Sequence, residues 1–303
     1  MESREHSLNR YLRAIGFSAL PKRSDINNII ADGLQKADYR AYTTNDEDEE
    51  SILAQYEIPL GSRFGISICG QFDGKDQFYP EYFYPYLDTE QVSSGKELSV
   101  EAKIDNDAFA GICEDDRVGV TLIFRLRNAI EYIKNTHTSF QPLQGVQISL
   151  TALSLEGTVL LPIYKTQEDV QRQRERQEQK HRWIQAAENG DEQAAHELTA
   201  MDMDLYSGIM SHIQYEDIYT IVDFHLMPYG AECELYSLLG EIRKVELQTN
   251  RMTNEEVVLL TIDCNGLYMD VIINRLDLVG EPQVGRRFRG SVWMQGKLLF
   301  PHA

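Results

Sequence analysis

The sequence predicts an α+β protein, with N-terminal helices and antiparallel hairpins, a helical hairpin insert and a C-terminal β-domain. Three observations favour this class: helical and hairpin patterns alternate, a strongly polar segment interrupts them, and apolar stretches punctuated by glycine fill the last part. We expect 1–164 to be an α+β domain, 165–217 a helical hairpin or spacer, and 218–303 an antiparallel β-domain. The last part is expected to form a small curled sheet or an OB-like or SH3-like barrel.

Two short helices are predicted near the N-terminus. The apolar residues of the first recur at helical spacing: Leu8, Tyr11, Leu12 and Ile15. Gly16 then stands where a left-handed C-cap is expected. Ser24 is placed to cap a second helix, whose apolar stripe follows at the same kind of spacing.

Hairpins and one further helix are predicted before residue 165. Ile52–Ile58 and Phe64–Phe72 have the composition of paired strands. Residues 118–134 place several large apolar side chains on one helical face, which predicts a buried helix. Val146–Leu153 and Thr158–Tyr164 are expected to form a second hairpin, with its turn at the intervening glycine.

The segment Phe78–Tyr86 carries six aromatic rings and two prolines. Because proline neither continues a helix nor donates to a central sheet, we expect an extended edge strand or a loop. If several of the rings are exposed together, they form a binding surface for a peptide, a sugar or another subunit. The alternative is that the rings cover and protect a sheet edge. The candidate binding residues are Tyr79, Tyr82, Tyr84 and Tyr86.

A polar insert is predicted after residue 164. Gln171–Lys180 contains no apolar residue, which indicates a solvated helix or a spacer. The pair Asn189-Gly190 is expected to end this helix, and Asp191 to cap the next one. The two helices would form a hairpin.

The C-terminal β-domain has the clearest strand and turn signals. Two apolar runs flank Asn265-Gly266, the dipeptide favoured in type I′ hairpin turns. Gly290 and Gly296 lie inside a later strand, where glycine permits the bend that closes a small sheet.

Charge and cysteine content narrow the possible functions and compartments. The formal net charge is −19, and such a surface repels a phosphate backbone and an anionic membrane. No apolar run approaches the ~20 residues needed to cross a bilayer. The four cysteines lie far apart and form no CxxC pair, which indicates free thiols in a reducing compartment, by default the cytoplasm.

The C-terminal barrel has one basic and aromatic cluster of the kind that binds single-stranded nucleic acid or sugar. Strand alternation places Arg287 and Arg289 on one face and Phe288 on the other, so we expect the aromatic side chains to lie in the core. Binding at Arg287 and Arg289 stays open, while nucleic acid is disfavoured as a partner.

Motifs for catalysis and cofactors are missing from the sequence. There is no nucleotide-binding loop, no nucleophile elbow and no zincin motif, and no cofactor is predicted. The acidic residues that follow Cys113 oppose formation of a thiolate. His212 and Glu216 are spaced to share a cation on one helical face, although acidic helix surfaces are ordinary in a protein of this charge.

Three stretches resemble an uncharacterised family of bacterial proteins, a domain of unknown function from anaerobic Gram-positive bacteria. They are Tyr11–Ser18, Arg117–Phe124, and Met227–Gly230 running on to Leu239–Ile242. The resemblance extends along nearly the whole chain and implies a single-family protein in a bacterial cytosol. It implies no activity, cofactor or catalytic residue.

The function expected from the sequence is non-catalytic: a cytosolic protein that binds a protein partner or forms a homo-oligomer. One alternative is a metal-assisted hydrolase that uses His212 and Glu216. A second alternative is a barrel that binds an oligonucleotide or a sugar.

Overall fold

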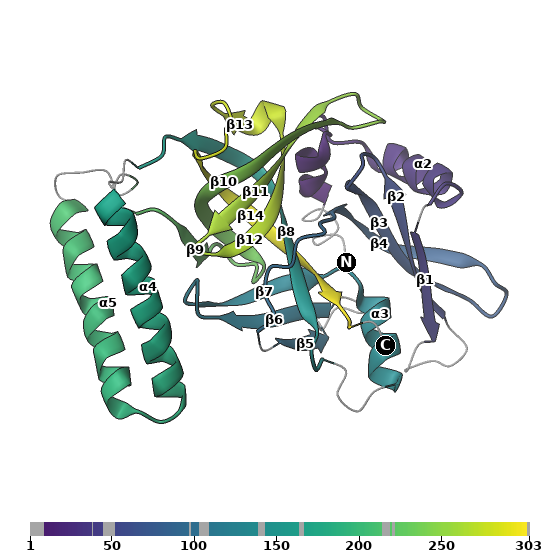
Figure 1. Ribbon diagram of the computed structural model, residues 1–303. Coiled ribbons are helices and arrows are strands. Elements are labelled where there is room, and N and C mark those ends of the chain that lie inside the picture. The colour runs from purple at the N-terminus through teal and green to yellow at the C-terminus, as the bar shows by residue number, and fades with distance from the viewer. Residues whose placement is uncertain are drawn as a thin grey trace. The chain divides into compact units, whose positions relative to one another are not determined.

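A computed structural model of the protein (Figure 1) describes residues 9–37, 39–44, 52–96, 98–102, 109–138, 143–163, 167–213, 219 and 222–301. The chain divides into two compact units. One contains Met1–Leu160 with Phe224–Ala303, and the other contains Leu161–Asp223. The fold is mostly β with a smaller share of helix, which agrees with the expected α+β class with a barrel.

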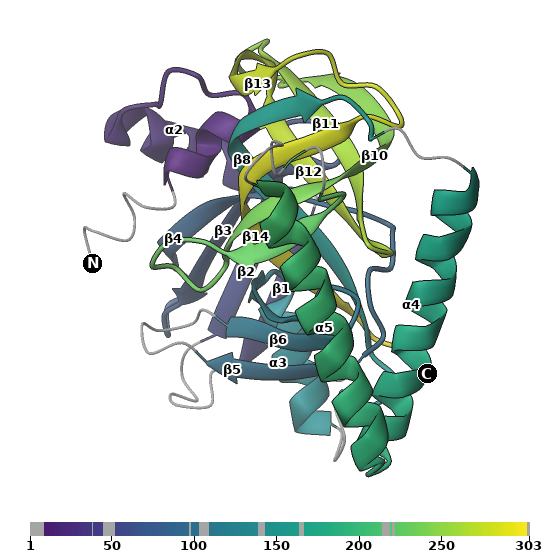
Figure 2. The ribbon, with the colours of Figure 1, turned by 90° about the vertical axis from the view of Figure 1, so that its left-hand side faces the viewer.

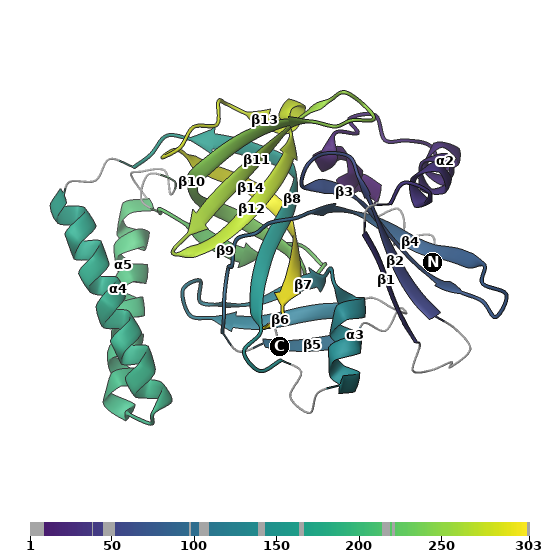
Figure 3. The same ribbon diagram turned by 45° about the vertical axis from the view of Figure 1, so that its right-hand side comes forward.

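A four-stranded antiparallel sheet, here called sheet A, lies in the first unit (Figure 3). Its strands, in spatial order, are β1 (Tyr39–Thr44), β2 (Ile52–Pro59), β3 (Phe64–Phe72) and β4 (Phe78–Leu87). The predicted hairpin of β2 and β3 is confirmed. Within sheet A, β4 pairs with β3 on one side alone, so it is the edge strand that its two prolines predict.

Five long strands close into a barrel. They are β8 (Gln147–Leu160), β10 (Leu235–Thr249), β11 (Glu256–Cys264), β12 (Leu267–Asn274) and β14 (Arg287–Leu299). The meander β10-β11-β12 is antiparallel, β12 pairs with β8 in parallel, and β14 closes the ring by pairing with β8 and β10. In Figure 1 the teal β8 runs among green and yellow strands, because it comes from before residue 165. The barrel therefore requires a strand from outside the C-terminal segment.

The predicted hairpin with a turn near Gly157 is wrong, because β8 runs through this position without turning. A Cβ atom at Gly157 would lie 2.5 Å from a ring carbon of Phe288. The missing side chain therefore makes room for a core ring across the β8–β14 pair. Glycine in a strand can mark close approach as well as a turn.

The predicted helix over residues 118–134 is wrong for its first part and right for residues 129–134. Val120–Leu126 forms strand β7, and helix α3 (Ala129–Thr138) begins only after it. Leu122, Phe124 and Leu126 alternate along the strand and are each at most 3% exposed. Residues four apart share a face in both a helix and a strand, so this spacing could not distinguish the two. Tertiary packing selected the strand.

Smaller strands extend the sheet that forms the barrel. They are β5 (Leu98–Ala102), β6 (Phe109–Asp115), β9 (His225–Pro228) and β13 (Leu278–Val279), with the 3-10 turn η2 (Arg275–Asp277) before β13. The β11–β12 turn is confirmed as type I′ in character, since Asn265 and Gly266 have φ values of 57° and 84°.

A hydrophobic core between sheet A and the barrel also contains two N-terminal elements, the 3-10 helix η1 (Arg10–Ile15) and helix α2 (Arg23–Leu34). The ring of Tyr11 stacks on Trp293 of β14, with centroids 4.7 Å apart. Gly16 ends η1 in the left-handed region as expected, with φ 95°. A second apolar cluster fills the barrel interior.

The second unit contains helices α4 (Gln167–Glu188) and α5 (Glu192–Ile213), which pack on each other as the expected hairpin (Figure 2). Gly190 has φ 90° at the turn, and the carboxylate of Asp191 accepts hydrogen bonds from the backbone of Gln193 and Ala194. Asp191 is therefore the N-cap that the sequence predicts. In the part of the chain that the structure describes, none of the helices is long and apolar enough to span a bilayer.

Candidate functional site

The candidate tyrosines of β4 do not share one environment. Tyr79 is 47% exposed, whereas Tyr84 and Tyr86 are 1% and 6% exposed, and Tyr82 is half-buried. A bulge in the β3–β4 pairing separates Tyr79 from the other three, which alternate on one face of the strand. The segment therefore presents no continuous exposed aromatic surface. Whether these tyrosines bind a ligand stays a prediction.

Two buried arginines lie over the tyrosines of β4. The guanidinium carbon of Arg125 lies 5.1 Å from the ring centroid of Tyr82 and 4.3 Å from that of Tyr84. That of Arg127 lies 4.6 Å from the centroid of Tyr86. We call this group of five residues the arginine–tyrosine layer. It lies where β4 of sheet A meets β7 and β14.

Arg127 is paired with two carboxylates, although its Nε is buried without a hydrogen-bond acceptor. It ion-pairs with Glu57 at 3.0 Å and Asp88 at 3.1 Å, and donates to the carbonyl of Leu87 at 2.6 Å. Burial alone lowers the pKa of Arg127, but the two carboxylates outweigh this effect and the pKa lies above its ordinary value. Arg127 therefore joins sheet A to β7 by a buried, charge-assisted network.

Arg125 differs from Arg127 in having no anionic partner. It is 8% exposed, and no carboxylate of the described residues lies within ion-pairing distance of it. Its Nε is buried without a hydrogen-bond acceptor, as is that of Arg127, so the missing carboxylate is what distinguishes Arg125. Burying an ion without a partner costs several kcal/mol, and each desolvated ring contact returns only about 2 kcal/mol. The rings offset part of this cost and leave the hydrogen-bonding capacity of the guanidinium unused.

The cysteine beside this layer is not activated. Burial raises the pKa of Cys69 to about 11, and burial also raises the pKa of Tyr82 above its usual range. Burial likewise raises the pKa of Cys113. These thiols are protonated at neutral pH, which is the opposite of what a nucleophilic cysteine requires.

The arginines of β14 face different surroundings. Arg287 is 7% exposed, whereas Arg289 is exposed. The rings of Phe288 and Trp293 are 0% and 2% exposed, which confirms that these aromatic side chains lie in the core. They are not available to stack on a base or a sugar ring.

The predicted metal residues lie outside the described part of the chain: Glu216 is not described, and His212 is described only as part of the backbone of α5. Among the residues that the structure does describe, there is no group of three or more histidine, cysteine, aspartate or glutamate side chains able to hold a metal ion. The proposed pairing of His212 with Glu216 is therefore untested.

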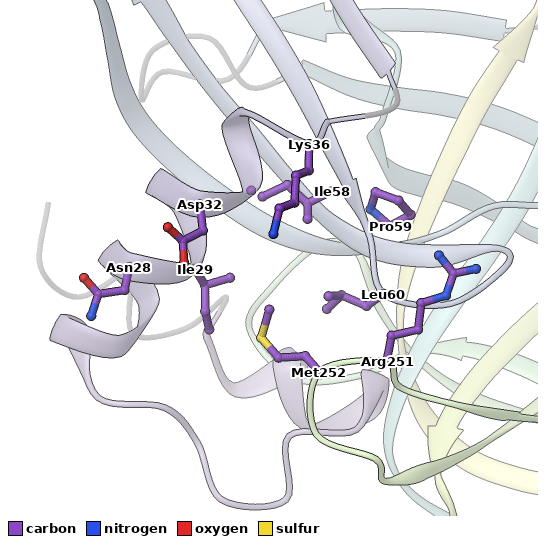
Figure 4. Close-up of a pocket in the computed structure, with 10 residues that line it drawn as sticks. Asn28, Ile29, Asp32, Lys36, Ile58, Pro59, Leu60, Arg251 and Met252 are labelled. Carbon is purple, nitrogen blue, oxygen red and sulfur yellow. The ribbon is translucent and has the colours of Figure 1, made fainter.

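A surface groove lies between α2, the end of β2 and the β10–β11 loop (Figure 4). Its volume is about 580 Å³, within the range of ligand sites. Five apolar side chains line it: Ile29, Ile58, Pro59, Leu60 and Met252. Leu60 is 3% exposed and Ile58 is 6% exposed, while Met252 is 46% exposed at the mouth.

Two cations flank this apolar lining. Figure 4 shows Lys36 projecting from the end of α2 toward the apolar side chains, with Arg251 on the opposite side. Both are exposed. Although Asp32 also lines the groove and precedes Lys36 by one helical turn, the described residues include no ion pair between them. The groove combines apolar contact area with two available positive charges.

Sequence reasoning missed both features. Arg125 and Arg127 were visible as two charges in an otherwise apolar stretch, a signal of buried arginine that the incorrect helix prediction obscured. Lys36 and Arg251 are more than two hundred positions apart in the sequence, and only the fold brings them to one groove.

The fold and these sites define a β-rich protein with a five-stranded barrel, an associated antiparallel sheet and a surface groove. A family model for a domain of unknown function, described for an E. rectale gene (DUF3881), matches residues 12–296. The chain belongs to this family, and the resemblance along nearly its whole length is confirmed. No curated protein and no solved structure matches the chain.

Proposed function

We propose that the protein is non-catalytic and acts by binding a protein partner or a second copy of itself, and that the groove beside α2 is the contact site. The observation that supports this is the apolar lining flanked by Lys36 and Arg251. Apolar area supplies binding energy, and unpaired cations at the edge select an acidic partner and orient it. The occupant that fits is a protein segment carrying apolar side chains beside a carboxylate.

The setting we propose is the cytoplasm. In support, all four cysteines are free thiols, and two of them are buried without a partner sulfur. The barrel belongs, in this proposal, to the OB-like or SH3-like small barrels and serves as the scaffold of the groove. The β10–β11 loop that carries Arg251 and Met252 is a connection between two of its strands.

The proposal is tested by charge reversal. Lys36→Glu with Arg251→Glu should abolish capture of the partner from lysate of the source organism. If the partner is a second copy, the double variant should instead remove the concentration-dependent rise in mass seen by light scattering. Lys75→Glu with Arg40→Glu is the matched control, because both residues are exposed cations outside the groove.

The proposal fails if the wild-type protein is a strict monomer that captures nothing, or if the control double variant loses the partner to the same degree. The first result excludes association altogether. The second shows that overall charge, and not the groove, determines binding.

A further inference from the structure

Of the two arginines in the arginine–tyrosine layer, Arg125 is the one without an ion pair to a described carboxylate. Its neighbour Arg127, two positions along the chain, meets two carboxylates and a carbonyl oxygen. Arg125 meets two ring faces and no carboxylate of the described residues. The Nε atoms of both arginines are buried without an acceptor, so the two residues differ in their carboxylate partners. Buried charges are normally paired, because burying an unpaired charge costs free energy. An unpaired buried charge is therefore a candidate functional site.

We propose that Arg125 anchors a binding site for an oxyanion, the phosphate or carboxylate group of a small ligand. The guanidinium presents N–H donors in a planar fork that matches both groups. The site uses none of the residues of the groove, and it stands or falls independently of partner binding there.

The terminal nitrogens of Arg125 are less enclosed than its Nε, while the residue as a whole is 8% exposed. Nε is enclosed and lacks an acceptor, whereas the two terminal nitrogens are not among the fully enclosed atoms. The rings of Tyr82 and Tyr84 pack against the guanidinium at 5.1 and 4.3 Å, which restricts its movement before a ligand arrives.

The charges around Arg125 favour a small anion over a second carboxylate side chain. The carboxylate of Glu57 is committed to Arg127 at 3.0 Å, and Asp88 is held by the same arginine. These two negative charges next to Arg127 disfavour a multiply charged ligand nearby. A single phosphate or carboxylate group bound to the guanidinium would give Arg125 the anionic partner that the described residues do not provide.

The site is tested with inorganic phosphate and with acetate, each compared with chloride at equal ionic strength. The measurement is the midpoint temperature of unfolding of the full chain, because a ligand that binds the folded state raises it. We expect phosphate, acetate or both to raise the midpoint of the wild type by a few degrees, with saturation. The anion whose effect saturates at the lower concentration is the preferred oxyanion.

Arg125→Met should remove this rise, and Arg125→Lys should weaken it at least tenfold in half-saturating concentration, since an ammonium lacks the fork. Arg40→Met is the matched control, because the guanidinium carbon of Arg40 also lies over a tyrosine ring, 5.8 Å from the centroid of Tyr56, but Arg40 is exposed. The rise in midpoint temperature should persist in this variant. If Arg125→Met fails to fold, the lysine variant decides. The proposal is overturned if the wild type shows no saturable rise with either anion, or if the Arg125 variants respond as the wild type does.

Discussion

Replacing each of the two buried arginines by methionine should change stability in different ways. Arg127→Met leaves Glu57 and Asp88 facing an apolar side chain, where the Glu57 side chain is only 14% exposed. Removing one partner of a buried ion pair costs about 3–5 kcal/mol. This is a large fraction of the roughly 5–15 kcal/mol that stabilises a typical folded protein.

Arg125→Met removes a buried charge that has no anionic partner. The variant loses two cation–π contacts, each worth about 2 kcal/mol when desolvated, but it is relieved of a desolvation cost of several kcal/mol. Methionine fills a similar space against the two rings and makes favourable sulfur–aromatic contacts. In phosphate-free chloride buffer, we expect the free energy of unfolding to stay within about 1 kcal/mol of the wild type or to rise.

Urea unfolding at pH 7 measures both variants, with tryptophan fluorescence as the signal. Trp293 is a suitable reporter, because its ring centroid lies 6.4 Å from that of Tyr84, a member of the arginine–tyrosine layer. The midpoint should fall strongly for Arg127→Met and little for Arg125→Met, with the same slope against urea in each case. Adding Glu57→Gln to the Arg127 variant should recover part of the loss. Equal destabilisation by the two methionine variants would refute the distinction between a paired and an unpaired charge.

Three further predictions concern the fold around the sites. Burial raises the pKa of Asp115, but the hydrogen bonds from Arg117 outweigh burial and lower the pKa overall. The contribution of Asp115 to stability is therefore present above about pH 4 and lost as the pH falls through the folded pKa. Asp115→Asn should flatten the acid limb of a curve of stability against pH. Gly157→Ala should destabilise by about 1–3 kcal/mol through overpacking against Phe288, which chemical unfolding measures. Asn250→Ala should cost about 1–3 kcal/mol, because it is 0% exposed and joins η1 to the β10–β11 loop; unchanged thermal stability would contradict this.

Local signals determined the parts of this protein that depend on a few consecutive residues. Asn265-Gly266 specifies its turn because both residues tolerate positive φ. Asp191 caps α5 because its carboxylate reaches backbone N–H groups two and three positions ahead. The prolines of β4 keep it at a sheet edge because they cannot donate to a second neighbour. In each case the interaction range is shorter than one helical turn or one hairpin.

The tertiary structure decided what depended on distant partners. Residues 120–126 became a strand because β6 and β14 were available to pair with them. Gly157 stayed within a strand because Phe288 occupies the space of its missing side chain. Barrel closure joined β8 to strands that begin more than a hundred positions later.

The candidate sites follow the same division. The aromatic segment could be found in the sequence, but the bulge in β4 and the approach of β7 decided which of its rings are buried. Lys36 and Arg251 meet at one groove, and Arg125 faces tyrosines instead of a carboxylate, because of how sheet A packs on the barrel. Composition supplied the charges and rings of this protein, while long-range packing determined which of them remain unpaired.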